Sequence, residues 1–348
     1  MPCSISRRTF LKISTAALPA LIFKPPRRHP SPPIASPYRP SGLLGRSLMI
    51  WITIYSRPSV FGRQVARYDK DELVPLYETI TGEDHNSQPD DWFRTDGGYV
   101  YHTNIQPVTV ALNPPPSAAP EGGQLIEITV PYVDAFSRPA FRGLPRYRLY
   151  YSSTHWVTDV VFDQDRRPWY SLEDDRINET YYVRAEYARP VPRGELTPLS
   201  PHIPADQKRI ELVTSTMWMY AYEGDTLVRQ ARIAAGTVFK APSGKVSDYR
   251  TPLGEYAVHM KRASRHMAGG DLAAADEFDL PGVPWVSYFN EGIALHGTYW
   301  HNIYGTAQSH GCINLEPEVS KWAFRWTLPA PIADQRETEA RGTRVLVR

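Results

Sequence analysis

The sequence predicts a mainly β fold built from several small domains, and three observations lead to that prediction. Aromatic residues make up 12% of the chain, with 21 Tyr and 9 Trp, which is a composition common in β-rich domains. Short strand-like runs separated by turn residues recur between residues 50 and 233, whereas one clear helical pattern follows near the carboxyl terminus. A chain of 348 residues is long enough for two or three domains with ample cores.

The charge balance argues against nucleic acid as a partner. The 39 basic and 37 acidic residues leave a net charge of +2, which is too small to create a strongly attractive field for a polyanion. The same balance gives only a weak case for binding an anionic surface. We therefore expect no nucleic-acid partner.

The amino terminus has the pattern of an export signal. Residues 6–12 read SRRTFLK, a twin-arginine motif, and a short apolar run follows at 13–23. That run is shorter than the ~20 residues that a helix needs to span a bilayer, so we expect a signal segment and no permanent membrane span. A chance Arg pair ahead of an apolar helix is the alternative. The signal and the start of a Pro-rich spacer are predicted at 1–35 and a linker at 36–46, which places the mature protein in the periplasm, the cell wall or the outer face of a prokaryotic envelope.

Two β-rich segments follow, expected at residues 47–110 and 124–193, and they resemble each other. The matching positions are Tyr55 and Phe136, Trp92 and Trp169, and Tyr99 and Tyr182. Each pair is separated by about 80 residues, which predicts an internal repeat. Pro and Gly residues between the two segments mark a linker.

The first of these segments contains strand-like runs at 50–55 and 98–101. With its Trp, Gly and Tyr-Val pair near the end, it resembles a bacterial SH3-like barrel, and the second segment resembles a more divergent copy. The resemblance implies two small barrels that bind or position the cell wall. Alternatively, both are passive spacers, or the second packs on the domain that follows it.

A third domain is expected at residues 205–348. Strands are predicted at 209–213, 217–222 and 227–233, joined by tight turns. Pro317 is placed to open a helix, as proline often does in a first turn. A core-facing stripe follows on this helix, consisting of Val319, Trp322, Ala323 and Trp326.

The chain has two cysteines, Cys3 and Cys312. Cys3 precedes the arginines of the signal and is expected to leave with it, so Cys312 would be a lone thiol in an oxidising compartment. Such a thiol is either buried and inert or reactive. Residues 309–314 read SHGCIN, and the apolar run before His296 ends in His-Gly. A nearby imidazole and flexible glycine are what a cysteine nucleophile needs for activation and for backbone donors.

These pieces together resemble the L,D-transpeptidase family with its YkuD-type catalytic domain. The matching motifs, in order, are TPLGEY at 251–256, PGVPW at 281–285, HGTYW at 296–300 and SHGCIN at 309–314. The resemblance covers roughly residues 205–348. It implies a β-rich, β-sandwich-like catalytic domain with a few helices.

The resemblance also implies roles for individual residues. Cys312 would be the nucleophile, His296 its base and the Gly297 carbonyl the group that orients the imidazole. Backbone amides near Gly311 and Cys312 would stabilise the oxyanion. The remaining candidates for lining the cleft or binding substrate are Ser309, His310, Trp300, Asn314 and Tyr288, with Tyr288 and residues 267–271 as a possible lid. Many relatives carry Arg where Asn314 stands.

The implied reaction is formation of 3→3 cross-links in peptidoglycan, without a cofactor or a metal ion. Cys312 would attack the tetrapeptide stem, release D-Ala and pass the acyl group to an acceptor amine, and carbapenems would acylate the same thiol. With water as acceptor, the site would be an L,D-carboxypeptidase. Two further alternatives are a wall-binding protein with an inactive catalytic domain and a metal hydrolase using His296, His301 and His310, although the sequence contains neither H-E-x-x-H nor C-x-x-C.

Overall fold

The computed structural model describes most of the chain after its amino-terminal part. The described residues are 42–83, 91–114, 116–141, 144–241, 243–270 and 277–348. The chain divides into two units, Met1–Pro37 and Tyr38–Arg348, and every described residue belongs to the second unit. Cys3, the predicted signal at 1–35 and most of the predicted linker lie outside the described residues.

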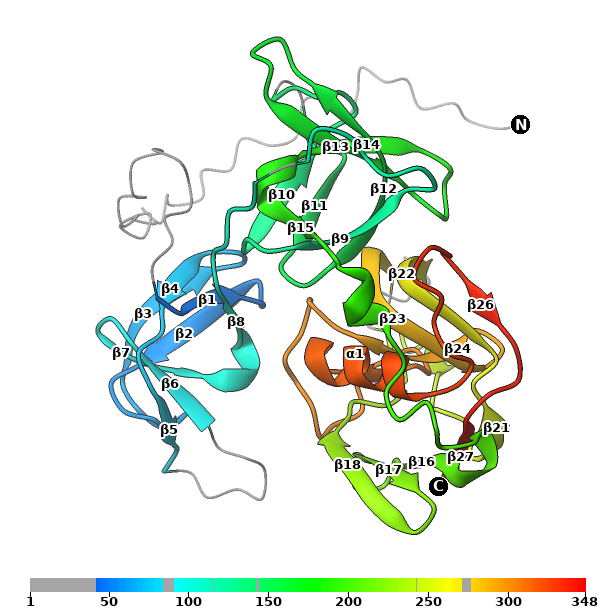
Figure 1. Cartoon of the computed structure of the whole chain (residues 1–348). Helices are drawn as coiled ribbons and strands as arrows, with labels where there is room; N and C mark the ends of the chain where they lie inside the picture. The colour runs from blue at the N-terminus through cyan, green and yellow to red at the C-terminus, as the bar shows by residue number, and fades with distance from the viewer. Residues whose placement is uncertain (1–41, 84–90, 115, 142–143, 242, 271–276) are drawn as a thin grey trace, which may run out of the picture. The chain divides into compact units, whose positions relative to one another are not determined.

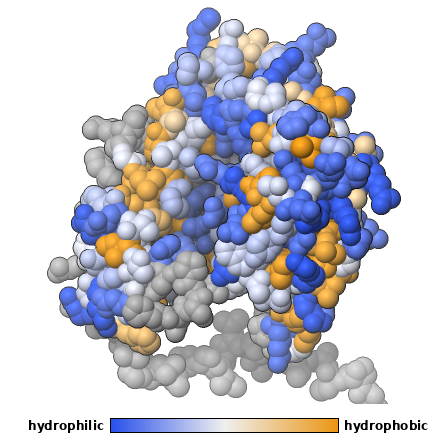
Figure 2. Space-filling view, turned by 60° about the horizontal axis from the view of Figure 1, so that its bottom comes forward, coloured by the Kyte–Doolittle hydropathy of each residue, from blue (hydrophilic) through white to orange (hydrophobic). Residues whose placement is uncertain are grey.

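The fold is mainly β, as predicted, and its strands fall into three successive stretches of chain (Figure 1). Within the described residues, the single α-helix is α1 (Pro317–Trp326) and no helix has the length and apolar character needed to cross a bilayer. Figure 2 shows hydrophobic residues on one face as separate patches among hydrophilic ones.

The first β segment (residues 44–108) forms a five-stranded sheet of order β3-β2-β7-β6-β5 and a three-stranded sheet of order β4-β1-β8. Its strands are β1 (Leu44–Ser47), β2 (Trp51–Tyr55), β3 (Gln64–Asp69), β4 (Leu73–Pro75), β5 (Thr79–Thr81), β6 (Asp91–Thr95), β7 (Gly98–Tyr101) and β8 (Ile105–Val108). The strands predicted at 50–55 and 98–101 are confirmed by β2 and β7. Strand β1 begins inside the region predicted as linker, because its short sequence LGRS has no hydrophobic alternation to reveal it.

The second β segment (residues 124–190) forms a five-stranded sheet of order β14-β13-β12-β9-β15 and a two-stranded sheet of β10 and β11. Its strands are β9 (Gln124–Ile128), β10 (Tyr132–Ala135), β11 (Tyr147–Tyr150), β12 (Thr154–Phe162), β13 (Pro168–Glu173), β14 (Thr180–Arg184) and β15 (Ala188–Pro190). In both segments a hairpin with a fully buried Trp, Trp92 or Trp169, is followed by a 3-10 turn and a strand. This order supports the predicted repeat, while the SH3-like assignment stays a prediction.

The third segment (residues 208–347) contains two five-stranded sheets, of order β18-β17-β16-β27-β21 and β25-β24-β23-β22-β26. Its strands are β16 (Lys208–Val213), β17 (Trp218–Glu223), β18 (Thr226–Arg232), β19 (Val238–Lys240), β20 (Val246–Asp248), β21 (Gly254–Ala257), β22 (Met260–Gly269), β23 (Phe278–Asn290), β24 (Ile293–Gly297), β25 (Ile313–Leu315), β26 (Thr338–Glu339) and β27 (Arg344–Val347). The three strands predicted at 209–233 are confirmed to within one residue at each end by β16, β17 and β18.

One hydrophobic cluster joins the two sheets of the third segment. Ile210 and Leu212 come from the first sheet, Leu295 and Ile313 from the second, and Val319 from α1. The predicted helix stripe is confirmed, because three of its residues are buried and the fourth is partly buried against the same cluster. The packed sheets hold β24 and β25 side by side.

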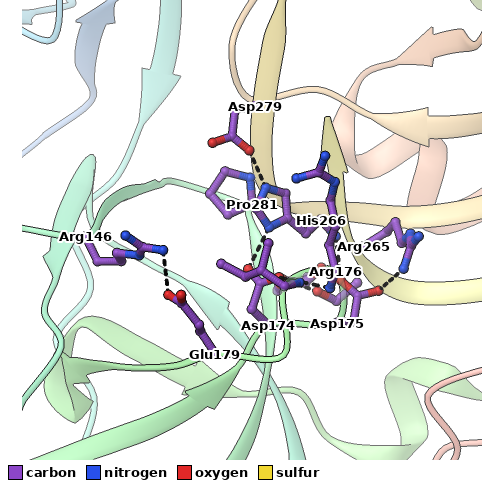
Figure 3. Close-up of polar contacts among 12 residues, drawn as sticks. Arg146, Asp174, Asp175, Arg176, Glu179, Arg265, His266, Asp279 and Pro281 are labelled. Carbon is purple, nitrogen blue, oxygen red and sulfur yellow. Dashed lines mark hydrogen bonds and ion pairs between the residues drawn. The ribbon is translucent and has the colours of Figure 1, made fainter. Parts of the chain in front are cut away.

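The second β segment packs against the third, as one of the sequence-based alternatives proposed. A shared hydrophobic cluster contains Trp156 from β12 and both Trp285 and Phe324 from the third segment. Nearby, His266 of β22 lies between Asp174 and Asp279, and Figure 3 shows these residues together with the Arg265–Asp175 ion pair. The second segment is therefore a structural neighbour of the hairpin formed by β22 and β23.

Candidate active site

Cys312 and His296 lie on the same face of two neighbouring strands. Strands β24 and β25 pair in parallel, with Leu295 opposite Ile313 and His296 opposite Asn314. Side chains alternate between the two faces of a strand, and Leu295 and Ile313 point into the main core. The alternation therefore puts His296, Asn314 and the preceding Cys312 on the opposite face.

The imidazole of His296 is buried and has a defined tautomer. Its Nδ1 lies 3.1 Å from the carbonyl oxygen of Gly297. A carbonyl can only accept, so Nδ1 carries the proton and Nε2 of the neutral ring is left to accept one. Burial lowers the pKa of His296 to about 4, although the bond to Gly297 acts in the opposite direction. The ring is therefore neutral near pH 7.

A glycine is required after His296 because its surroundings are crowded. A Cβ on Gly297 would lie 2.6 Å from Ser320 Oγ and 2.9 Å from Pro284 Cγ. The residue predicted to orient the imidazole is thus held in place by α1 on one side and β23 on the other.

The thiol of Cys312 is partly buried beside hydrophobic side chains. Burial raises the pKa of Cys312 to about 11, while the backbone amide of Ala294 acts to lower it. In this state the thiol points to the carbonyl oxygen of Gly292, at an Sγ-to-O distance of 3.8 Å. Cys312 is therefore protonated near neutral pH, and its thiol lies within donor distance of the Gly292 carbonyl.

The turn before Cys312 is tied down by hydrogen bonds. Ser309 Oγ donates to the carbonyl of Cys312 and accepts the Gly311 amide at 3.2 Å. The carbonyl of Gly311 accepts from Thr251 Oγ1 at 2.8 Å, and Thr251 Oγ1 accepts the Gly236 amide at 2.9 Å. Gly311 has φ +110, a conformation that favours glycine.

Thr251 is a site residue to which the sequence alone gave no role. It is the first residue of the TPLGEY motif and is buried. Its hydroxyl is the only side-chain group among the described residues that bridges the Gly236 amide and the Gly311 carbonyl. The motif indicated that the position matters, but the partner lies 60 residues away in sequence.

His310 lies in a group of aromatic rings. Its ring centroid is 4.3 Å from that of Phe239, 4.6 Å from that of Tyr249 and 4.8 Å from that of Phe278. Phe278 is the first residue of strand β23. The predicted lid covers residues 267–271, which precede this strand. Residues 271–276 lie outside the described residues, and residues 267–269 belong to β22.

Asn314 is bound to His301, which sequence reasoning considered only as a metal ligand. The amide of Asn314 lies 2.7 Å from Nε2 of His301, and Nδ1 of His301 accepts the Ile303 amide at 3.2 Å. The atom of Asn314 that faces Nε2 is its amide nitrogen Nδ2, while its Oδ1 is buried without a hydrogen-bond partner among the described residues. Burial lowers the pKa of His301 to about 4, and nearby His296 lowers it further.

Trp300 and Tyr288 complete the surroundings of the two candidate residues. The Trp300 ring lies 5.8 Å from that of His296, at an angle of 36°. Both Trp300 and Tyr288 pack in the cluster that includes Cys312. Burial raises the pKa of Tyr288. All the predicted site residues thus lie along β23, β24, β25 and the loop between the last two.

The histidines considered for a metal site have other neighbours. His301 is bonded to Asn314 and His310 is surrounded by aromatic rings. Across the described ranges, no group of three or more His, Cys, Asp or Glu side chains is arranged to hold a metal ion.

Comparison with known proteins identifies the third segment. The family model described as the L,D-transpeptidase catalytic domain, YkuD, matches residues 207–347. No curated protein matches the chain.

Several solved structures are similar to part of the chain. A mutant L,D-transpeptidase from Enterococcus faecium is 23% identical with a TM-score of 0.31, covering 41% of this chain and 50% of that one. An L,D-transpeptidase from Xylanimonas cellulosilytica is 24% identical with a TM-score of 0.30, covering 46% and 64%. One from Mycobacterium smegmatis is 13% identical with a TM-score of 0.32, covering 56% and 89%. The chain spans about half the length of the first solved structures it matches. On the match of the family model, residues 207–347 belong to the YkuD family of L,D-transpeptidase catalytic domains.

Proposed function

We propose that this protein is an exported peptidoglycan L,D-transpeptidase with Cys312 as nucleophile and His296 as general base. The observation that carries the proposal is the common face of β24 and β25: His296 lies opposite Asn314 in the register, and the alternation of side chains puts Cys312, two residues before Asn314, on that same face. The match of residues 207–347 to the YkuD family supports the substrate class.

The protonation of the pair determines how the first step proceeds. With pKa values of about 11 for Cys312 and about 4 for His296, both groups are neutral in the resting enzyme. Attack is therefore coupled to proton transfer and does not start from a stored thiolate. The proposed first step requires the Cys312 proton to move to Nε2 of His296.

The donor is a tetrapeptide stem, attacked at the carbonyl between the third residue and the terminal D-Ala. Sγ of Cys312 bonds to the carbonyl carbon while its proton moves to Nε2 of His296. The C–N bond then breaks, and D-Ala leaves after taking that proton as an amine. An acceptor side-chain amine attacks the thioester, Cys312 regains its proton, and a 3→3 cross-link results.

We assign the backbone amide of Cys312 as the main oxyanion donor. The amide of Gly311, the other candidate, already donates to Ser309 Oγ. Ser309 and Gly311 hold the turn that aims the Cys312 amide, while His310, Trp300, Asn314 and Tyr288 line the cleft.

Export and wall binding belong to the same proposal. The twin-arginine motif supports export to the cell wall or periplasm, and the predicted SH3-like units would contribute binding to peptidoglycan. Neither a cofactor nor a metal ion is required by the chemistry described for Cys312 and His296.

Substitution of Cys312 by Ala tests the proposal. We expect the wild-type enzyme to form a covalent adduct with a stem tetrapeptide, visible by intact-protein mass spectrometry, and to release D-Ala. Cys312→Ala should form no adduct and release no D-Ala, because no other side chain in the proposed site can form a thioester. Circular dichroism would check that the variant is folded.

Adding an acceptor amine separates the possible products. A cross-linked peptide supports transpeptidation, whereas a free tripeptide means that water is the acceptor and the enzyme is an L,D-carboxypeptidase. Binding to sacculi without any adduct would indicate a wall-binding protein with an inactive domain. Undiminished D-Ala release by Cys312→Ala would refute the mechanism.

A further inference from the structure

Arg46 is a fully buried arginine in β1, with 1% of its surface exposed. Arginine is almost never buried to this extent unless its donors are paired. Its Nη1 donates to Asp71 Oδ1 at 2.8 Å, and its Nε and Nη2 donate to Gln106 Oε1 at 3.1 and 2.7 Å. The first β segment therefore holds the guanidinium in one orientation.

The remaining partners of Arg46 belong to the other two segments. Its Nη2 also donates to the backbone carbonyl of Tyr299, in the loop after β24. The guanidinium lies over the ring of Tyr150 from β11, 4.3 Å from the ring centroid. One buried side chain thus contacts the first β segment, the second β segment and the YkuD domain.

Tyr299 makes contacts through its carbonyl, its hydroxyl and its ring. Its carbonyl accepts from Arg46, and its ring stacks on Tyr150 with a centroid distance of 5.5 Å and an angle of 23°. Its hydroxyl donates to the Pro281 carbonyl of β23 at 2.8 Å. Pro281 lies beside His266 and Asp279 in Figure 3, at the part of the β22–β23 hairpin that contacts the second segment.

The same loop has a second anchor in the first β segment. Asn302 Nδ2 lies 3.3 Å from the His102 carbonyl and 3.1 Å from the Ile105 carbonyl. Trp300 lies between the two anchors, 5.0 Å from the Tyr299 ring and 5.8 Å from the His296 ring. The first β segment thus contacts Tyr299 and Asn302, on either side of Trp300, whose ring packs against the imidazole.

We propose that Arg46 is a positioning residue for His296, acting through Tyr299 and Trp300. The inference rests on the proposed function, in which His296 is the general base. A displacement of a catalytic group by about 1 Å can lower a rate by about 100-fold. The first β segment is therefore part of the apparatus that aligns the base, whether or not it also binds the wall.

The test measures acylation of the full-length chain by a carbapenem. Arg46→Met removes every donor but keeps an apolar chain of similar length. We expect the limiting acylation rate constant to fall by about 10- to 100-fold, while the apparent binding constant changes less. The matched control is Arg148→Met, since Arg148 also pairs with Asp71, at 3.2 Å, but otherwise contacts Asp134 and Tyr132. It should retain a rate near that of the wild type.

A double-mutant cycle distinguishes positioning from general stability. If Arg46 acts through His296, Arg46→Met should change the residual rate of His296→Ala by less than about twofold. An equally large loss in both backgrounds would overturn the inference. A folded Arg46→Met enzyme that acylates at the wild-type rate would also overturn it.

Asn302→Ala decides the question if Arg46→Met does not fold, because it removes the second anchor without leaving a buried charge. A lower limiting rate supports the inference, and an unchanged rate contradicts it. The proposed function fails separately, if the wild-type chain is not acylated or if Cys312→Ala still is. If acylation of the wild type requires Cys312 but is unchanged in Arg46→Met and Asn302→Ala, the proposed function stands. Only the positioning role of Arg46 is then refuted.

Discussion

At the residue scale, burial controls the protonation of both proposed catalytic side chains. It raises the pKa of Cys312 to about 11 and lowers that of His296 to about 4, so that the neutral pair exists across the pH range between these values. The two groups would share one proton during attack. The pKa values obtained from the pH dependence of the rate therefore belong to the pair and not to either residue alone.

The pH dependence of acylation tests His296. The second-order rate constant of the wild type should be nearly constant around neutral pH and fall as the pH drops toward about 4, where His296 becomes protonated and can no longer accept. His296→Ala should lower the rate at neutral pH by about 10²- to 10⁴-fold. In the variant the fall in rate toward low pH (the acid limb of the profile) should be absent. Its rate should instead rise as the pH approaches the pKa of Cys312.

Stopped-flow measurement with a β-lactam over the stable pH range gives these profiles. An acid limb near pH 6.5, the ordinary range of histidine, would contradict the burial of the imidazole. An acid limb that survives in His296→Ala would assign it to another group.

The residues proposed to carry the chemistry could be named from the sequence because their motifs are local. The positions of Cys312, His296 and Gly297 follow from short stretches in which each residue type has a chemical reason. Arg46 and Thr251 were given no role, because their importance arises from partners that are distant in sequence. The sequence predicts a linker at Arg46, because a lone Arg beside Gly resembles a surface residue, whereas β4 and β8 enclose it in the structure.

At the element scale, the β22–β23 hairpin connects the proposed site with the second β segment. The hairpin carries Phe278, which packs on His310, and Met267 and Leu280, which pack in the cluster with Cys312. On its outer side, His266 Nδ1 lies 2.6 Å from Asp174 Oδ2, and Nε2 faces Asp279. Both ring nitrogens thus face carboxylates, which favours the charged imidazolium.

Burial lowers the pKa of His266, but its hydrogen bonds to Asp174 and Asp279 outweigh that effect and the pKa is raised. A pKa that is raised in the folded state stabilises the protein. This contribution is complete at pH values below the histidine pKa of the unfolded chain, about 6.5. The contribution is lost as the pH rises through the folded-state pKa. The junction of hairpin and second segment should therefore weaken in alkaline solution.

Substitution of Asp174 tests this pH dependence. Asp174→Asn should destabilise the protein at pH 6 by about 1–3 kcal/mol, because a buried charged hydrogen bond is lost. The loss should be smaller at pH 9, because the contribution of the charged His266 declines as the pH rises through its raised pKa. Urea unfolding at the two pH values measures the difference. The control is Glu179→Gln, which removes the half-exposed ion pair with Arg146 in the same region (Figure 3) and should change stability little. Equal destabilisation by Asp174→Asn at both pH values would rule out titration of His266.

Individual strands were more predictable than their order. The runs that became β2, β7 and β16 have clear hydrophobic patterns, and local pattern is what determines a strand's position. By contrast, the carboxyl-terminal strand β27 lies between β16 and β21, in parallel to β16. No local feature of its four residues specifies those neighbours, because the pairing depends on the arrangement of the whole sheet.

At the scale of the described unit, the second β segment and the YkuD domain share a core. Trp156 of β12 packs in one hydrophobic cluster with Ala263, Trp285 and Phe324. Thr154 Oγ1 also donates to the Ala263 carbonyl at 2.7 Å, across the same junction. A spacer would not need such a buried contact, so the second segment has a structural role besides any binding to the wall.

The shared core predicts that these two parts unfold together. Removing the buried indole in Trp156→Ala should destabilise the protein by about 3–5 kcal/mol, the usual effect of deleting a large core side chain. Trp51 supplies the control, because its side chain is half exposed and Trp51→Ala should have a much smaller effect. Near-ultraviolet circular dichroism follows the aromatic packing during urea unfolding, and carbapenem acylation follows the integrity of the active site. The two transitions should coincide in the wild type and move to lower urea together in Trp156→Ala. If acylation competence keeps its wild-type midpoint while the aromatic signal shifts, the YkuD domain is stable by itself and the common core does not couple the two parts.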